Sequence, residues 1–250
     1  MEAKLNDIYE FLRNNRAYNK ELQTKYYKSV FSNLGDVRDR VISLLYSVAN
    51  SQSQPRIDCL AEFYQFIYKD TDSLTSFNKF VKRVSDKDNG CYKDLFDGLK
   101  KYSGWGDKTS ALFTKAVFQL RNDNYGKGLQ LWQDTPQHIG DSDRLYLPVD
   151  AVIKEIFKKL GYNKLDFNTI NNEINKTHPG AKIEVWDDLW FWGFISQRVV
   201  NGGKRKFEWN SNKYWALEHS NKDASVIDDI EAKSKCFLEI LEGAITSQCT

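Results

Sequence analysis

Cysteine, histidine and proline are scarce in this sequence. Its 250 residues include four cysteines, three histidines and four prolines. No two cysteines form a CxxC pair, and the histidines lie far from them, so no zinc or iron–sulfur spacing is present. We therefore predict no metal site. We also expect the cysteines to be reduced thiols, as is usual in the cytosol.

Long hydrophobic runs are also missing. The longest, residues 41–49, is interrupted by serines and is far shorter than the roughly 20 residues that cross a bilayer. Residues 1–7 lack the basic patch and apolar stretch of a secretory signal. We therefore expect no membrane contact and a cytoplasmic location, associated with the nucleoid in a prokaryote.

An excess of charge of one sign is the third absence. Lysine and arginine number 36 against 34 aspartate and glutamate, a net charge of +2. Proteins that coat nucleic acid non-specifically usually carry a strong basic excess, so any DNA contact is expected through a local patch. Residues 204–206, which are basic and precede Trp209, Tyr214 and Trp215, are one candidate, with a solvated surface as the alternative.

Helical periodicity is what the sequence contains instead. Apolar residues recur at three- and four-residue spacing, as at Leu5, Ile8 and Leu12, and few prolines interrupt them. The fold class is therefore predicted to be mainly α. Further helices are predicted near residues 37–48, 58–68, 73–84, 91–101, 108–121, 150–160, 167–175, 185–196 and 225–242, with a short strand or extended arm near 201–209.

A Gly-x-Gly turn stands out in the window 99–113, between a helix end and a new helix start. Gly104 and Gly106 allow the turn to bring backbone N–H groups against an anion, at the positive end of the next helix. A DNA phosphate is a natural ligand for such a turn. A plain helical hairpin would show the same pattern.

A second short motif, Pro148-Val149-Asp150, precedes another predicted helix. Pro148 disfavours helix immediately before itself, and Asp150 can cap the helix that follows. Asp150 is therefore either an N-cap alone or also a carboxylate held at a helix start and directed into a cleft.

Together, Gly104-Trp105-Gly106-Asp107-Lys108-Thr109 and Pro148-Val149-Asp150 resemble the helix-hairpin-helix/Gly-Pro-Asp superfamily of DNA glycosylases, especially the archaeal 8-oxoguanine glycosylases. The resemblance implies a two-lobed helical fold with a helix-hairpin-helix motif and an active site in the cleft between the lobes. It identifies Lys108 and Asp150 as the catalytic pair. Because monofunctional members lack the lysine, it implies a bifunctional glycosylase/AP lyase that acts on damaged double-stranded DNA.

On this resemblance the 250 residues form a single glycosylase unit. The hairpin spans about 91–121, the helix of the catalytic aspartate 150–160, and C-terminal helices with a basic, aromatic arm 185–250. Residues 122–147 contain turn formers without a sustained period and lengthen the family's usual connection, so they are interpreted as an insertion. Such an insertion can simply decorate the surface.

The paired lysine and aspartate explain the implied chemistry. An uncharged lysine amine can attack the anomeric carbon of a damaged nucleoside, displace the base and form a Schiff base that permits β-elimination. Asp150 would stabilise the positive charge that develops on the sugar. The alternative for Lys108 is a solvated lysine in a first helical turn.

The resemblance also assigns residues to the flipped base. Asp188 and Trp192 are four positions apart, hence on one helix face, and match the acid and the stacking aromatic of a late family helix. Otherwise the tryptophans of residues 186–192 are expected to be core. Leu112 stands where the family places the opposite wall, and Phe113 is its possible substitute.

The remaining assignments concern the strand that carries the lesion. Gln52, in competition with Gln54, matches a glutamine that reads the purine edge, since an amide offers both a donor and an acceptor. Arg56, together with the turn Gly104, Trp105 and Gly106, is assigned to DNA contacts. For Trp105 two roles stay open: it plugs the core or it leans on the DNA backbone.

Three functions follow from these residues. The first is a monomeric repair enzyme of base excision repair that excises an oxidised purine, 8-oxoguanine, without metal or organic cofactor. The second is a monofunctional glycosylase for another damaged base, in which Lys108 is incidental. The third is a non-catalytic helix-hairpin-helix module that only binds DNA.

Overall fold

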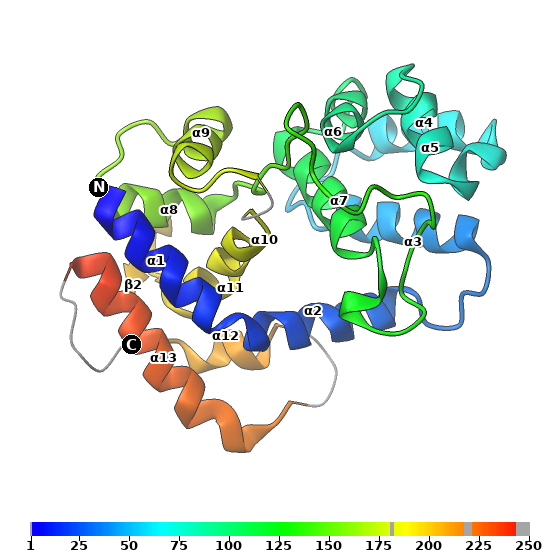
Figure 1. Cartoon of the computed structure of the whole chain (residues 1–250). Coiled ribbons are helices and arrows are strands. Elements are labelled where there is room, and N and C mark those ends of the chain that lie inside the picture. Colours follow the sequence, from blue (N-terminus) through cyan, green and yellow to red (C-terminus); the bar gives the residue numbers. More distant parts are fainter. Residues whose placement is uncertain (1, 181–182, 218–221, 244–250) are drawn as a thin grey trace. The chain divides into compact units, whose positions relative to one another are not determined.

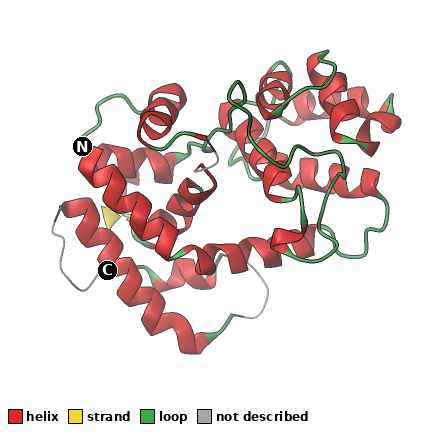
Figure 2. Cartoon of the chain, in the orientation of Figure 1, coloured by secondary structure: helices red, strands yellow, loops and turns green. Residues whose placement is uncertain are grey.

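The computed structural model describes residues 2–180, 183–217 and 222–243, which are mainly helical (Figures 1 and 2), as the sequence predicts. Within these residues the sheet structure is one antiparallel pair, β1 (Gln197–Val199) and β2 (Arg205–Phe207), with Arg198 opposite Lys206. None of the described helices is both long and apolar enough to cross a membrane. The chain divides into two compact units: unit 2 is Gln23–Pro148, and unit 1 is formed by the described residues before and after it.

Unit 1 is built on the apolar faces of short helices. Leu5, Ile8 and Leu12 recur at helical spacing in the first helix and are at most 1% exposed, because that helix packs against three others of the unit. The elements are α1 (Glu2–Asn14), the first part of α2 (Arg16–Val30), α8 (Ala151–Lys159), α9 (Phe167–Thr177), α10 (Ile183–Trp186), α11 (Asp188–Ile195), the two strands, η4 (Asn201–Gly203), α12 (Ser211–Trp215), η5 (Ala224–Val226) and α13 (Ile227–Glu242).

Close packing of α8 against α11 fixes the part of unit 1 that matters for the candidate site. Gly193 of α11 allows it: a Cβ at this position would lie 2.4 Å from Ile156 Cδ1 and 2.9 Å from Val152 Cγ1, both on α8. A larger residue at 193 would force the side chains of Ile156 and Val152 to shift. The start of α8 therefore stays close to the side chains of α11.

Unit 2 surrounds the helix α7, which packs against α3 and α6. Phe113 and Val117 of α7 are fully buried. The elements are the rest of α2, α3 (Val37–Asn50), α4 (Ile57–Tyr68), η1 (Thr71–Thr75), α5 (Phe77–Ser85), α6 (Tyr92–Lys100), α7 (Asp107–Gln119) and η2 (Asp123–Tyr125).

Residues 122–147 contribute to the core of unit 2, although η2 is their regular structure. Trp132 is 2% exposed, and its indole N–H donates a hydrogen bond of 2.8 Å to the carbonyl of Leu74. The carboxylates of Asp134 and Asp143 accept hydrogen bonds from backbone N–H groups in the first turns of α5 and α6. The segment caps two helices and contributes to the core, so of the roles left open for it, simple decoration of the surface does not apply.

Two predicted helices have different boundaries in the structure, and two observed helices were not predicted. The helix predicted at 73–84 is divided at Ser76, whose hydroxyl caps α5 by accepting from Lys79 N. The helix predicted at 185–196 consists of α10 and α11, which meet at Asp187. The helices α2 and α12 were not predicted, because α2 carries few apolar residues and α12 is only five residues long.

Two predictions concern the C-terminal part. Cys59 and Cys91 are free, but Cys236 of α13 is disulfide-bonded, so the expectation of reduced thiols is wrong for Cys236. Sequence spacing cannot reveal such a pair, because the fold decides which cysteines meet. Residues 218–221 and 244–250 of the predicted arm lie outside the described residues.

Candidate functional site

The predicted hairpin motif joins α6 and α7 in unit 2, and the two helices pack against each other (Figure 1). Gly104 in the turn has a φ of +92°, a left-handed conformation that residues with side chains rarely adopt. A Cβ there would also lie 3.1 Å from Leu60 Cδ2 on α4. Both the backbone and the space around it therefore favour glycine at position 104.

Gly106 is the N-cap of α7, with an ordinary φ of −81°. Because glycine has no side chain, the first N–H groups of α7 receive no side-chain cap. These groups and the helix dipole favour an anion at this end. Asp107 already places a carboxylate here, held by the ammonium of Lys100 at 2.5 Å. A phosphate at this turn would have to compete with Asp107.

Lys108 stands in the first turn of α7 and is half-buried. Its Nζ donates a long hydrogen bond of 3.5 Å to the backbone oxygen of Ser51. The side-chain nitrogen of the neighbouring Gln52 donates to the carbonyls of Ala49, at 3.1 Å, and Gly104, at 3.2 Å. Lys108 and Gln52 thus meet at the end of α3, where Gln52 ties that helix to the hairpin turn.

The other predicted residues of unit 2 differ in exposure. Trp105 is 1% exposed and its ring lies 5.0 Å from Phe63 and 5.9 Å from Phe113, so its indole plugs the core and does not offer a face to DNA. Phe113 is fully buried, whereas Leu112 is half-buried. Of the two candidates for the wall of a base pocket, Leu112 is therefore the accessible one. Arg56 is exposed at the start of α4.

In unit 1, Asp150 has both carboxylate oxygens engaged. Its Oδ1 caps α8 by accepting from the N–H groups of Val152 and Ile153 at 2.8 and 3.0 Å. Its Oδ2 accepts from the indole Nε1 of Trp190 on α11 at 2.9 Å. The predicted N-cap is confirmed, and the second oxygen is held by a tryptophan that the sequence suggested only as core. Trp190 is half-buried.

Asp188 is a buried carboxyl group on the same helix, 4% exposed. Asn19 Nδ2 donates to its Oδ1 at 2.6 Å, and Arg16 Nε lies 3.4 Å from its Oδ2. Burial raises the pKa of Asp188 to about 8, with a smaller contribution from Asp187 and against the opposing effects of Asn19 and Arg16. Near neutral pH the folded protein therefore holds Asp188 largely as a carboxylic acid, which can donate as well as accept a hydrogen bond.

Trp192 is fully buried beside Asp188. Phe11 and Tyr18 pack edge-on against its ring, with centroids 5.1 and 5.5 Å away. The hydroxyl of Tyr18 donates to Asp229. A purine could stack on Trp192 only after one of these rings moves.

Sequence reasoning missed the residues of α2 that complete this group. Arg16, Tyr18 and Asn19 contact Asp188 or Trp192, yet the first 35 residues carry no part of the resemblance. The available signal was weak: Asn15 and Asn19 recur at helical spacing, and both are buried.

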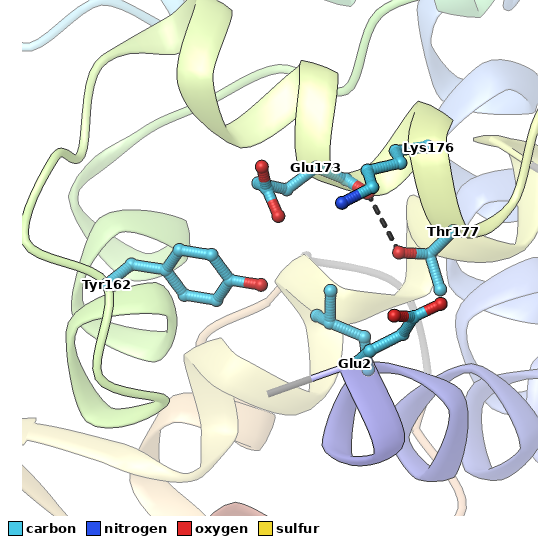
Figure 3. A pocket seen from close by; sticks show the side chains of 6 residues that line it. Glu2, Tyr162, Glu173, Lys176 and Thr177 are labelled. Atoms are coloured by element: carbon cyan, nitrogen blue, oxygen red, sulfur yellow. Dashed lines mark hydrogen bonds between the residues drawn. The ribbon is translucent and has the colours of Figure 1, made fainter.

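A cavity of about 190 Å³ lies elsewhere in unit 1 (Figure 3) and contains none of the predicted site residues. Tyr162 and Glu173 point into it, and burial followed by the charge of Glu173 raises the pKa of Tyr162. Its other lining residues are Glu2, Leu5, Lys176 and Thr177. It is smaller than the roughly 300 Å³ at which ligand pockets begin.

In the part of the chain that the structure describes, no cluster of three or more His, Cys, Asp or Glu side chains is arranged to hold a metal ion. No protein-family model, no curated protein and no solved structure matches this chain. A functional assignment therefore rests on the chemistry of the residues themselves.

Proposed function

We propose that this protein is a bifunctional DNA glycosylase/AP lyase of base excision repair that removes 8-oxoguanine from double-stranded DNA. Lys108 is the nucleophile and Asp150 its electrostatic partner. The proposal includes a helix-hairpin-helix role for α6 and α7, and it requires that Lys108 of unit 2 and Asp150 of unit 1 act on the same nucleotide.

The observation that carries the proposal is the setting of Lys108. The lysine follows directly on a turn that needs glycine at 104 and that leaves the start of α7 without a side-chain cap. Lys108 is half-buried, and its amine donates one long hydrogen bond to the backbone at the end of α3. A hydrogen bond of this length is weak, so a substrate can replace it. A lysine with only a structural role in a first helical turn would gain nothing from the helix dipole there.

The chemistry assigns each residue a step. The neutral amine of Lys108 attacks C1′, the C1′–N9 bond breaks, and the base leaves with the electron pair and takes up a proton. The sugar ring opens to a protonated imine on Lys108, a base removes a C2′ proton, and the C3′–O3′ bond breaks with release of the 3′ phosphate. Asp150 stabilises the positive charge on the sugar during the first step.

The neutral Asp188 suits a role in reading the base. A carboxylic acid can donate a hydrogen bond to a purine acceptor, and Asn19 beside it can donate another once the two side chains separate. Trp192 would supply a stacking face after Tyr18 or Phe11 moves.

Borohydride trapping tests the proposal. Purified protein is incubated with a duplex that contains one 8-oxoguanine opposite cytosine, alongside Lys108→Gln and the control Lys115→Gln, which changes a lysine two turns further along α7. We expect a covalent adduct with the wild type and with Lys115→Gln, and none with Lys108→Gln, although this variant should still bind the duplex.

The other outcomes point away from the proposal in different directions. Trapping by Lys108→Gln at the wild-type level would refute the nucleophile assignment. Base release without an adduct would indicate a monofunctional glycosylase. Duplex binding without release of any damaged base would leave a DNA-binding module.

A further inference from the structure

A half-buried lysine of unit 1, Lys213, is linked to Asp150 through the rings of Phe194 and Trp190 and has no ion-pair partner among the described residues. Lys213 belongs to α12, which packs against α11, and its ammonium lies 4.6 Å from the centroid of the Phe194 ring. Within the described residues its ammonium forms no ion pair and donates no hydrogen bond. The Phe194 ring gives this half-buried ammonium only a weak attraction.

A second cation stands close to Lys213. Arg205 of β2 is also half-buried, and its guanidinium donates to Gln197 Oε1 at 3.3 Å, while no carboxylate of the described chain pairs with it. Burial, and then the charge of Arg205, lower the pKa of Lys213, and the charge of Asp150 opposes this effect. The two cations therefore repel each other within electrostatic range of Asp150.

The neighbouring carboxylates that the structure describes do not neutralise this pair. Glu208, the acid next to β2, is taken by Lys206 at 2.5 Å and by Arg198 at 3.5 Å. Asp150 accepts hydrogen bonds from three N–H groups, two in the backbone of α8 and one on the indole of Trp190. Among the described residues, Asp150 is the carboxylate whose charge acts on Lys213, and it faces two cations, so an added anion would relieve their repulsion.

An aromatic platform completes the surroundings. Phe194 stacks on Trp190 with ring centroids 4.9 Å apart and planes at 14°, and Trp190 is the residue that holds Asp150. A ligand with a negative group for the cations and an apolar part for the rings fits this combination. A nucleotide within a DNA strand has both.

We propose that Lys213 and Arg205 form a binding site for a DNA phosphodiester next to Asp150, with Phe194 and Trp190 supporting the adjoining nucleotide. The inference deepens the proposed function and rests on it for the identity of the ligand. It assigns to unit 1 a phosphate contact of its own, separate from the glycine turn of unit 2.

Duplex binding as a function of salt tests this site without any catalytic step. The probe is a fluorescein-labelled duplex of ordinary bases, and its dissociation constant is measured by anisotropy between about 50 and 300 mM KCl. We expect Lys213→Met to weaken binding about threefold to tenfold and to reduce the slope of log Kd against log [KCl] by about one, because one phosphate contact is lost. Arg205→Gln should do the same, and Lys213→Arg should restore the wild-type slope.

Lys235→Met is the matched control. Lys235 is an exposed lysine of unit 1 on α13 that pairs with Glu231, so its removal should leave the slope unchanged. Thermal unfolding of each variant checks that the fold is retained. Should Lys213→Met not fold, Arg205→Gln together with Lys213→Arg decides the question.

Three results would overturn the inference, and two of them concern duplex binding. One is a wild-type slope in both Lys213→Met and Arg205→Gln, and the other is a wild-type protein that does not bind the duplex. Replacing chloride by inorganic phosphate at constant ionic strength separates the sources of phosphate: if the variants lose only a sensitivity to inorganic phosphate, the site takes free phosphate and the DNA inference is wrong. If the slope depends on Lys213 but no lesion yields an adduct, the proposed function fails while this site stands.

Discussion

Replacing Asp188 by asparagine should remove a pH dependence from the stability of this protein. Burial holds the pKa of the Asp188 carboxyl at about 8 in the folded protein, against an ordinary value of 3.8. Between these values the folded protein keeps a proton that the unfolded chain has released. The stability associated with this proton is complete below the ordinary value and is lost as the pH rises through about 8.

The size of the effect follows from the same shift. A group that is protonated only in the folded state changes the free energy of unfolding by about 1.4 kcal/mol per pH unit, and this slope falls to half at its folded pKa. Between pH 6 and 8 the wild type should therefore lose about 2 kcal/mol relative to Asp188→Asn, out of a total stability of about 5–15 kcal/mol. Asparagine preserves the acceptor that Asn19 uses, and Arg16, Glu184 and Asp187 face the site in both proteins.

Urea unfolding at several pH values measures this difference. Any constant offset between the two proteins, for example from the new amide beside Arg16, cancels in the slope. The control is Asp166→Asn: hydrogen bonds from Thr169 lower the pKa of Asp166 to about 2, so this carboxyl is charged in both states throughout the range. Parallel stability curves for the wild type and Asp188→Asn would show that Asp188 is ionised in the folded protein and would refute the reasoning.

Three further substitutions test other parts of the structure. Gly104→Ala should lower the free energy of unfolding by about 1–3 kcal/mol, because alanine is strained in the left-handed conformation of position 104. Gly106→Ala should lower it by less than about 1 kcal/mol, because position 106 has an ordinary φ and open space around it. Equal urea midpoints for the two variants would contradict this prediction. Trp132→Phe should cost about 1–3 kcal/mol in the same assay, since it leaves a buried carbonyl without its donor. Trp190→Phe should slow single-turnover base excision about tenfold, which corresponds to the loss of one hydrogen bond to a charged group. The control Trp186→Phe, which removes a buried indole N–H that has no hydrogen-bond partner, should leave the rate unchanged. Equal excision rates for Trp190→Phe and the wild type would show that Trp190 does not position Asp150.

Local sequence patterns were sufficient for most helices of both units. Periodic apolar residues place α1, α3, α4, α6, α7, α8 and α13 within a few residues of their observed limits. The motif glycines and the capping role of Asp150 were also readable, because a turn that needs a left-handed residue and a helix start both depend on a few neighbouring residues.

Contacts between distant segments explain what the sequence could not show. At the break between η1 and α5, the carboxylate of Asp134 accepts a hydrogen bond from the backbone N–H of Phe77. The two residues are 57 positions apart in the sequence. Residues 122–147 have no helical or strand period, because their buried side chains are placed by loops and not by a repeating backbone. Similarly, the roles of the α11 aromatic residues differ: Trp192 is core and Trp190 reaches Asp150, a difference that composition alone does not contain.

The two proposed catalytic residues are held by different kinds of constraint, which has a consequence for the site. The position of Lys108 is set by the backbone of the preceding turn. Gly104 gives this turn its left-handed conformation, and Gln52 donates a hydrogen bond to the carbonyl of Gly104. The Oδ2 of Asp150 is held by a single side chain, the indole of Trp190, because Oδ1 is committed to the cap of α8. Changes in the core around α7 should therefore leave the lysine in position so long as position 104 stays glycine. The position of Asp150 is more sensitive to substitution, because loss of the indole N–H of Trp190 on α11 releases the carboxylate oxygen that would face the sugar.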